Sequence, residues 1–255
     1  MAKERMSIKK EKYTDFAEHY DYVLKDIDYE EWFHYLKELM LTYNPQAESI
    51  LEIGCGTGKF GAKFSSEGYK IIGVDYSLEM LLSARKRARK NFKLICADAS
   101  NFSFKKKFDF IFCVHDTLNY ILDMKHVGLL LENAAGCMHP DSIFIFDSTT
   151  EYNIINNFDK QRSDYYHKGC YIKWENAYDR KKRIITSKLR FLNDNKDTTE
   201  EHLQRIHSYN EILSAIERSP LELITVFGDY TFEQPVEETV MVNYICRLKK
   251  SKERS

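Results

Sequence analysis

Three glycines at alternate positions, directly after an apolar run, are the first feature of this sequence that points to chemistry. The stretch ILEIGCGTGKFG covers residues 50–61 and contains Gly54, Gly56 and Gly58. A glycine loop between a strand and a helix presents backbone amides to a ligand at close range. The nicotinamide fingerprint G-x-G-x-x-G/A requires Gly or Ala where this chain has Lys59, so the spacing disfavours a dehydrogenase. It fits no Walker A pattern either.

Polar residues close the next apolar runs along the chain. Asp75 ends KIIGVD, Asp98 ends FKLICAD, and FDFIFCV is followed by His115 and Asp116. Open α/β sheets bind their ligands at the carboxyl edge, where such strand ends meet. His115 is the best candidate for a general base, because an imidazole titrates near neutral pH. Asp116 is expected to orient a histidine or hold a substrate hydroxyl. A structural histidine and a helix N-cap are the alternative roles of these two residues.

Five short apolar runs alternate with segments of helical periodicity after Pro45. The helical segments are KFGAKFSSEG, SLEMLLSARKRARK and MKHVGLLLENAAGCM. The runs predict strands at residues 49–54, 70–75, 92–98, 108–114 and 142–147. Strands that are apolar on both faces and alternate with helices predict a parallel sheet covered on two sides. The core is therefore expected to be a doubly wound α/β domain.

The region before Pro45 has a different pattern. Aromatic and aliphatic residues recur at helical spacing over residues 13–42. This spacing predicts two amphipathic helices, interrupted near residues 26–28.

The region after Thr150 changes character again. CYIKWENAYD and RIITSKLRFL predict an antiparallel hairpin joined by residues 180–183, with EEHLQRIH as a third strand. SYNEILSAIERS predicts a helix with Ser208 as its N-cap. LELITVFGDY and TVMVNYICRLK predict two further strands, and the tail KKSKERS is expected to be disordered.

The glycine stretch resembles the first motif of the class I S-adenosylmethionine-dependent methyltransferases. That motif, E/D-x-G-x-G-x-G, stands here as EIGCGTG over residues 52–58. YTDFAEHYDYV, over residues 13–23, resembles the opening of the small-molecule branch, which includes sugar amine and glycine-type N-methyltransferases. The resemblance implies a Rossmann-like, doubly wound, mostly parallel seven-stranded sheet with an N-terminal helical lid and an antiparallel β cap.

The expected organisation is one structural domain in four parts. These are a helical lid over residues 1–44, a cofactor-binding Rossmann-like core over 45–150, an antiparallel β cap insertion over 151–207, and a C-terminal helix with the last two core strands over 208–255.

The same resemblance implies S-adenosylmethionine as cofactor and S-adenosylhomocysteine as product. Asp75 is expected to accept both ribose hydroxyls, since a carboxylate only accepts hydrogen bonds. Asp98 is expected near the adenine amino group, and Met80 either against the adenine face or in the core. The residues expected to bind the cofactor are Tyr20, Glu52, Gly54, Cys55, Gly56, Gly58, Asp75, Tyr76, Met80, Ala97, Asp98, Ala99 and Val114.

The acceptor is expected between the end of the fourth strand, the lid and the cap. Arg205 is a candidate to hold a carboxylate or phosphate, as in a nucleotide-linked sugar, with a surface salt bridge as the alternative. No N-P-P-Y type tetrapeptide follows the fourth strand, which counts against a DNA or protein-glutamine N-methyltransferase. The residues expected to contact the acceptor are Tyr13, Asn119, Tyr120, Trp174, His202 and Arg205.

Composition limits the partners. The chain has 38 Lys and Arg against 39 Asp and Glu, so bulk charge attracts neither nucleic acid nor an anionic membrane. Its six cysteines include no C-x-x-C pair, so no metal site is expected. A charged N-terminus and the lack of a long apolar run predict a cytoplasmic protein.

The sequence thus predicts a methyltransferase that modifies oxygen or nitrogen of a small polar molecule, for instance a nucleotide-linked sugar, and acts as a monomer or homodimer. An RNA or protein methyltransferase and a non-catalytic cofactor-binding subunit are the alternatives.

Overall fold

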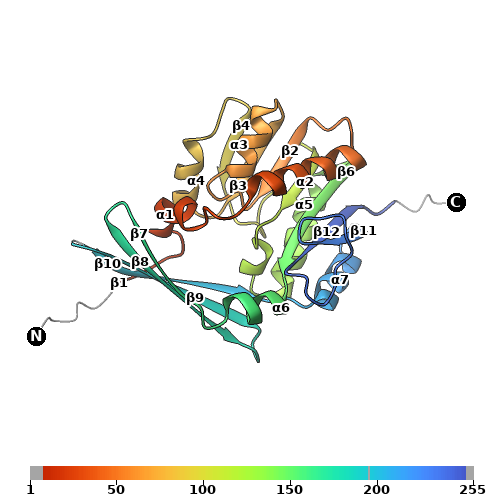
Figure 1. The fold of residues 1–255 in the computed structure, drawn as a ribbon. Helices are drawn as coiled ribbons and strands as arrows, with labels where there is room; N and C mark the ends of the chain where they lie inside the picture. Colours follow the sequence, from red (N-terminus) through yellow and green to blue (C-terminus); the bar gives the residue numbers. More distant parts are fainter. Residues whose placement is uncertain (1–7, 195, 251–255) are drawn as a thin grey trace, which may run out of the picture.

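A seven-stranded sheet forms the centre of the computed structural model, which describes residues 8–194 and 196–250 (Figure 1). Its strand order is β11-β12-β6-β5-β2-β3-β4. The strands are β2 (Ser49–Ile53), β3 (Lys70–Asp75), β4 (Phe92–Cys96), β5 (Phe108–Cys113), β6 (Met138–Thr149), β11 (Leu221–Gly228) and β12 (Met241–Leu248). β12 is antiparallel to both of its neighbours, and the other pairings in this sheet are parallel. The predicted mostly parallel, seven-stranded α/β fold is confirmed.

The chain changes direction across this sheet at one point, between β2 and β5. From β2 it continues through β3 and β4 toward one edge, whereas β5 and β6 extend toward the other. The glycine loop follows β2 directly. It therefore lies at the topological switch point, where open α/β sheets place their ligand crevice.

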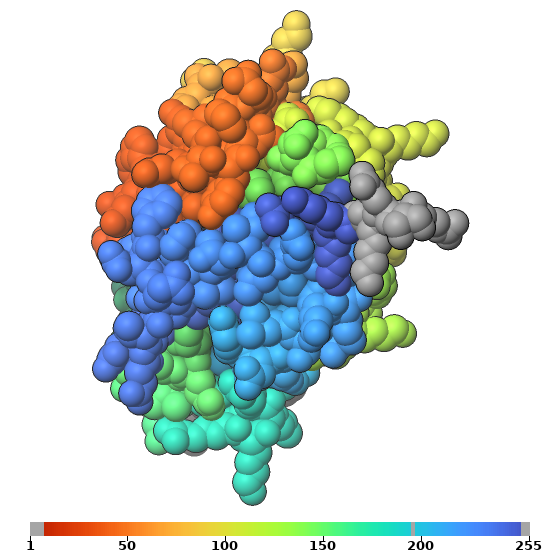
Figure 2. Space-filling model, turned by 90° about the vertical axis from the view of Figure 1, so that its right-hand side faces the viewer, coloured from red at the N-terminus to blue at the C-terminus, as the bar shows by residue number. Residues whose placement is uncertain are grey.

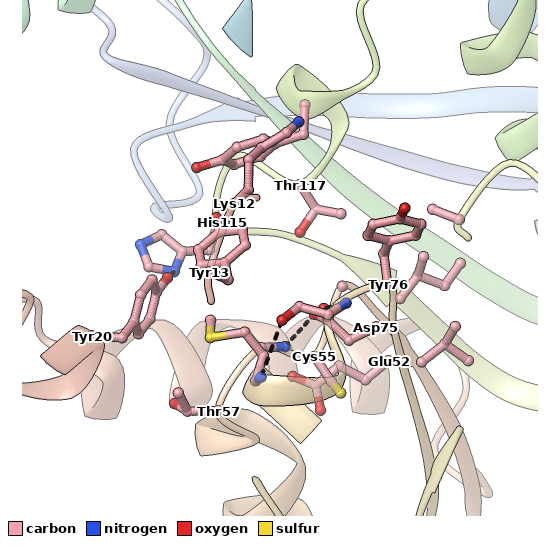
Figure 3. A pocket seen from close by; sticks show the side chains of 18 of the residues that line it. Lys12, Tyr13, Tyr20, Glu52, Cys55, Thr57, Asp75, Tyr76, His115 and Thr117 are labelled. Carbon is pink, nitrogen blue, oxygen red and sulfur yellow. Dashed lines mark hydrogen bonds between the residues drawn. The ribbon is translucent and has the colours of Figure 1, made fainter. Parts of the chain in front are cut away.

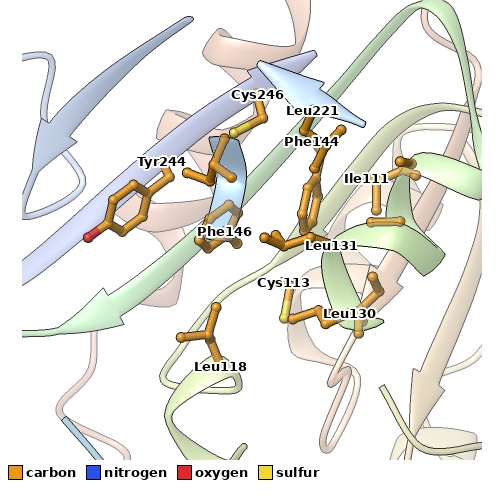
Figure 4. Packing of buried hydrophobic residues seen from close by; sticks show 14 of the residues in the cluster. Ile111, Cys113, Leu118, Leu130, Leu131, Phe144, Phe146, Leu221, Tyr244 and Cys246 are labelled. Carbon is orange, nitrogen blue, oxygen red and sulfur yellow. The ribbon is translucent and has the colours of Figure 1, made fainter. Parts of the chain in front are cut away.

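Alternate residues of the central strands pack against opposite helix layers. Phe110 and Phe112 of β5 belong to a buried cluster with α2 and α3. Ile111 and Cys113 lie in the cluster that α5 and α7 cover (Figure 4). The helices that cover the sheet or lie at its edge are α2 (Tyr29–Tyr43), α3 (Lys59–Ser66), α4 (Leu78–Arg85), α5 (Met124–Gly136) and α7 (Tyr209–Arg218). Both faces of β5 are thus buried, as the apolar runs predicted.

A second sheet of five strands forms the cap, in the order β1-β10-β9-β8-β7. Its strands are β1 (Ile8–Lys10), β7 (Arg162–His167), β8 (Cys170–Asp179), β9 (Ile184–Asn193) and β10 (Lys196–Arg205). The predicted hairpin and third strand correspond to β8, β9 and β10, whereas β1 and β7 were not predicted. The cap extends away from the central sheet in Figure 1, and its teal segment projects beyond the rest of the surface in Figure 2.

The lid helix α1 (Phe16–Val23) lies between the cap and the core (Figure 1). Phe16 and Val23 pack with Ile172, Leu189 and Phe191 of the cap in one buried cluster. A break follows before α2, where Asp28 accepts the amides of two residues of the first helical turn. The predicted pair of N-terminal helices is confirmed.

Several shorter features complete the fold. β5 is followed by a 3₁₀ turn, η1 (Leu118–Tyr120), and β6 is followed by α6 (Glu151–Asn153) and the π-helical η2 (Ile154–Phe158). Ser208 caps α7 with a capping box to Glu211, as predicted. The far end of the tail, residues 251–255, lies outside the described residues. Over residues 8–194 and 196–250, no helix is long and apolar enough to span a membrane.

Candidate active site

A cavity of about 720 Å³ opens at the carboxyl edge of the central sheet, beneath the lid and the cap (Figure 3). The glycine loop, the ends of β3, β4 and β5, and the first turn of α4 line it on the core side. The segment before α1, together with Tyr20 and Glu201, lines it on the opposite side. A space of this volume accommodates a ligand of several hundred daltons.

The glycine loop has a backbone that other residues adopt only at a cost. Gly54, Gly56 and Gly58 have φ angles of 75°, 52° and 75°. A Cβ on Gly54 would lie 2.3 Å from Oγ1 of Thr117, so this position also lacks space for a side chain. Positive φ and close approach together explain why glycine stands at these positions.

Asp75 connects the loop to the end of β3. Its Oδ2 accepts the Gly56 amide at 2.7 Å, and its Oδ1 accepts the Ser77 amide at 2.9 Å. Burial raises the pKa of Asp75, and the two amides oppose this rise because they stabilise the carboxylate. Each carboxylate oxygen has a further lone pair for a ligand hydroxyl.

Glu52 lies beneath the loop, with 3% of its surface exposed. Burial raises the pKa of this carboxyl strongly. Its Oε2 has no hydrogen-bond partner in the described part of the chain, although the residue lines the cavity. A buried polar oxygen without a partner is costly, and a ligand that donates a hydrogen bond offsets that cost.

The cavity is mainly apolar beyond Asp75. The side chain of Met80 reaches toward the loop, with its Cε 3.3 Å from the position of a Cβ on Gly56. Asp98 accepts the amide and hydroxyl of Ser100 through Oδ1, which orients its carboxylate at the end of β4. Other expected cofactor residues that line this region are Cys55, Tyr76, Ala97, Ala99 and Val114.

His115 and Asp116 form a strained turn after β5. Both have a φ of 63°, in the left-handed region that non-glycine residues seldom occupy. Their amides donate to Asp147, at 2.6 Å from His115 and 3.1 Å from Asp116. The hydroxyl of Tyr230 also donates to this carboxylate. A single buried acid at the end of β6 thus holds the turn in place.

The His115 ring lies among aromatic side chains of the lid region. Its Nδ1 is 3.3 Å from the hydroxyls of both Tyr20 and Tyr29, and the Trp32 ring meets it edge-on. Burial lowers the pKa of His115 to about 4, so the imidazole is neutral at physiological pH. Burial raises the pKa of Asp116 to about 6.

Three tyrosines cover the cavity. Tyr13 lies 6.2 Å from Tyr20 and 5.8 Å from Tyr120 between ring centroids. Burial raises the pKa of all three, so they are neutral hydroxyls that donate hydrogen bonds. Residues expected from the sequence at both the cofactor and the acceptor therefore meet in one space.

Other residues expected at the site do not line this cavity. Asn119 is fully buried, donates to the carbonyl of Arg205 and accepts the Thr149 amide, so it joins the cap to the core. The indole of Trp174 donates to Asn176 and packs on the lid. These two side chains are already engaged in structural contacts.

Arg205, Gly58, Asp116 and His202 also lie outside the lining. Arg205 pairs with Glu211 and donates to a backbone carbonyl, which matches the salt-bridge alternative. Gly58 starts α3, where a Cβ would lie 2.9 Å from the Cβ of Ala84. Oδ1 of Asp116 is buried with no partner among the described residues. His202 lies behind Tyr120.

Several residues around the cavity were missed by the sequence reasoning. Asp147 ends the apolar run SIFIFD in the same way that Asp75 ends KIIGVD. A polar residue at the end of a strand is a candidate for the site, so the sequence did point to Asp147. The local sequence around Tyr29 and Tyr230 gives no such signal, because both residues contact the turn after β5 from distant parts of the chain. Lys59 lines the cavity as well, with its Nζ 3.8 Å from the Tyr29 ring centre.

Residues 50–141 match the family model described as a methyltransferase domain. This segment is a methyltransferase domain. A solved S-adenosylmethionine-dependent methyltransferase from Clostridium acetobutylicum has the same fold, with a TM-score of 0.80 and 24% identity over 92% of this chain and 98% of that one. The fold is thus that of the class I S-adenosylmethionine-dependent methyltransferases.

Two curated relatives match shorter stretches of the chain. A putative methyltransferase of Geobacillus sp. (strain WCH70) is 28% identical over 57% of this chain and 61% of its own length. A dTDP-3-amino-3,6-dideoxy-alpha-D-glucopyranose N,N-dimethyltransferase of Streptomyces fradiae is 27% identical over 52% of each. The matches thus span between half and two thirds of these relatives.

The residues around the cavity fit S-adenosylmethionine as the cofactor. The bare glycine backbone leaves room for an amino acid moiety, and the Asp75 carboxylate suits a pair of ribose hydroxyls. Glu52 adds a buried oxygen that lacks a partner within the described chain. A donor on the ligand satisfies that oxygen.

Proposed function

We propose that this methyltransferase modifies the nitrogen or oxygen of a small polar molecule, and that an amino group of a nucleotide-linked sugar is its favoured acceptor. The observation that carries the proposal is the covered cavity, in which tyrosines of the lid and of η1 oppose the glycine loop. Methyl transfer needs alignment of the acceptor and exclusion of water, and a cavity covered by the lid favours both.

Each of the proposed cofactor residues would contact a different part of the ligand. Asp75 would accept the ribose hydroxyls while its own two amide bonds hold it in place. Glu52 would accept a hydrogen bond from the amino acid end, and Met80 with Ala97 would border the adenine. When bound, the cofactor would supply an electrophilic methyl group on a sulfonium, whose carbon an acceptor lone pair can attack in line with the carbon–sulfur bond.

The proposed acceptor side is formed by His115 and the tyrosines. A neutral imidazole that faces Tyr20 and Tyr29 orients their hydroxyls, and those hydroxyls would bind polar groups of the acceptor. Asp116, as a carboxylate close by, would stabilise the positive charge that an amine acceptor gains as it is methylated. A pKa of about 4 makes His115 a weak base, which favours an amine, because an amine can attack before it loses a proton.

The name of the Streptomyces fradiae relative supports the choice of a sugar amine. The covering cap counts against RNA and protein acceptors, which need an open face. The proposal extends to a cytoplasmic enzyme that works as a monomer or homodimer. A subunit that binds the cofactor without turnover is the main competing hypothesis.

The proposal is tested by following isotope-labelled methyl from S-adenosylmethionine into a cell lysate that is then separated into low-mass, RNA and protein fractions. Label in the low-mass fraction supports it, and mass spectrometry identifies the product. Label in RNA or protein contradicts the assignment of the acceptor. Cofactor binding without label in any fraction favours the non-catalytic subunit.

A further inference from the structure

Behind the cavity wall lies a chain of three polar side chains that the cofactor residues do not use. Glu200 and His202 lie on the same face of β10, since residues two apart in a strand share a face. Tyr120 stands between His202 and the cavity, which it lines. The chain therefore runs from a buried acid to the space where the acceptor binds.

Glu200 is fully buried and surrounded by donors. Its carboxylate accepts the backbone amides of Tyr13, Asp15 and Phe16, and also Nε2 of His202 at 3.0 Å. Glu200 thus accepts hydrogen bonds from three backbone amides and one imidazole, at the joint between lid and cap.

The position of Glu200 determines which imidazole nitrogen of His202 carries the hydrogen. Nε2 of His202 faces an acceptor, so Nε2 carries the hydrogen, and Nδ1 of the neutral ring is an acceptor. The hydroxyl of Tyr120 lies 3.4 Å from that Nδ1, a distance at which catalytic hydrogen bonds often stand before a substrate binds. Tyr120 therefore donates its proton toward His202.

Aromatic rings of the lid segment pack around His202, and Nζ of Lys12 lies 5.2 Å from the centre of the Tyr120 ring. The rings of Tyr13 and Phe16 meet the imidazole edge-on, with centroids at 4.7 Å and 5.7 Å. His202 itself is 2% exposed. A proton that arrives at Nδ1 thus enters a ring that Glu200 contacts directly, in an environment where water does little to screen their attraction.

We infer that Tyr120, supported by His202 and Glu200, accepts the proton that the acceptor loses during methyl transfer. This inference rests on the proposed function and identifies the base that His115 does not provide. Tyr120 is the catalytic residue, because it reaches the cavity, and His202 and Glu200 are positioning residues that act through it.

The proton and electron balance is complete. The acceptor nitrogen or oxygen forms a bond to the methyl carbon as the carbon–sulfur bond breaks, and the sulfonium becomes a neutral thioether. As this bond forms, the acceptor gives its proton to the phenolic oxygen of Tyr120, which passes its own proton to Nδ1 of His202. The resulting imidazolium is paired with Glu200 and later releases the proton to water.

The activity test compares Tyr120→Phe, His202→Asn and the double variant in the labelled-methyl assay on the low-mass fraction. Each single variant is expected to lose about 100-fold in kcat, the usual scale of general base catalysis, with unchanged cofactor affinity by calorimetry. Because the residues act as a unit, the double variant is expected to be no slower than either single one. Wild-type turnover in Tyr120→Phe, or losses that multiply in the double variant, would overturn the relay.

Two matched controls separate the relay from the general effects of substitution. Tyr166→Phe changes an exposed tyrosine of the cap, and His34→Asn an exposed histidine of α2, and both are expected to retain wild-type kcat. Glu200 is left unchanged because it also binds three amides of the lid segment.

Imidazole ¹⁵N NMR of wild-type protein tests the relay without an acceptor. The expected result is a neutral His202 with its hydrogen on Nε2, and an Nδ1 resonance that moves in Tyr120→Phe. A His202 that is already an imidazolium at neutral pH, or that carries its hydrogen on Nδ1, cannot receive the proton and overturns the inference. Failure of the proposed function is recognised separately, as a wild-type enzyme that transfers no label.

Discussion

The carboxylate of Asp147 accepts the backbone amide of His115 at 2.6 Å. The first residue ends β6 and the second follows β5, so the bond joins neighbouring strand ends at the carboxyl edge. Three donors converge on Asp147, namely the amides of His115 and Asp116 and the hydroxyl of Tyr230. The position of the His115 ring in the site therefore depends on an acid that does not itself line the cavity.

Asp147→Asn is expected to change how stability depends on pH. Burial raises the pKa of Asp147 to about 7 from 3.8, so the folded state holds a proton that the unfolded state has released. The contribution of this group to stability therefore falls as the pH rises from about 4 to 7 and is constant above that. Urea unfolding of both proteins across this window should show wild type losing stability relative to Asp147→Asn. A difference that does not vary with pH would contradict the raised pKa, and Asp164→Asn, on exposed β7, is the control.

Asp75→Ala is expected to weaken binding of S-adenosylmethionine at least tenfold, about 1.4 kcal/mol. The substitution removes the ribose acceptor and also releases the Gly56 and Ser77 amides that the carboxylate holds. Isothermal titration calorimetry measures the change, with Asp164→Ala on the cap as a matched control. Unaltered affinity would disprove the assignment of Asp75 to the cofactor.

Two glycine substitutions should move stability in opposite directions. Gly54→Ala places a methyl group 2.3 Å from Thr117 at a φ of 75°, and is expected to cost about 1–3 kcal/mol. Gly128→Ala lies within α5, where nothing comes within 4 Å of the new Cβ, and is expected to stabilise the fold by about 0.5–1 kcal/mol. Denaturant unfolding tests the pair, and equal effects would contradict the geometry of the loop.

Asp21→Ala is expected to loosen the lid with little change in global stability. Asp21 in α1 accepts the hydroxyl of Thr57 at 2.8 Å and pairs with Arg87, which ties the lid to the glycine loop. This pair is about one-third exposed, so its contribution to unfolding is about 0.2–1 kcal/mol. Hydrogen exchange across α1 should nevertheless accelerate. Glu48→Ala, which breaks the exposed pair with Lys70, should leave exchange in α1 as it was.

The central sheet was predictable because its strands are buried on both faces. Runs such as FDFIFCV lack regular polar alternation, and their repeated alternation with helical segments is typical of a parallel sheet between helix layers. β1 was not predictable, since Ile8–Lys10 contains two charged residues and is a strand only through its pairing with β10. β7, with its sequence RSDYYH, likewise depends on its pairing with β8.

Residues that line the cavity were predictable where they directly follow a strand. They were less predictable where two segments distant in the sequence meet. Asp75 and His115 follow apolar runs, and both line the cavity. Arg205 was a candidate to bind an anionic group of the acceptor. Its guanidinium instead pairs with Glu211, because α7 begins close to the end of β10. The left-handed turn at His115 has no local signal, since the energy that holds it comes from Asp147 and Tyr230.

The parallel pairing of β1 with β10 has a practical consequence for producing the protein. Ile8–Lys10 occupies the outer edge of the cap sheet, and Lys9 pairs with Glu201 across it. Removing Ile8–Lys10 would leave Thr198–Glu200 of β10 unpaired, an edge that can recruit strands from other molecules. Expression vectors that trim this end therefore risk insoluble material, and a purification handle is better joined to the opposite terminus.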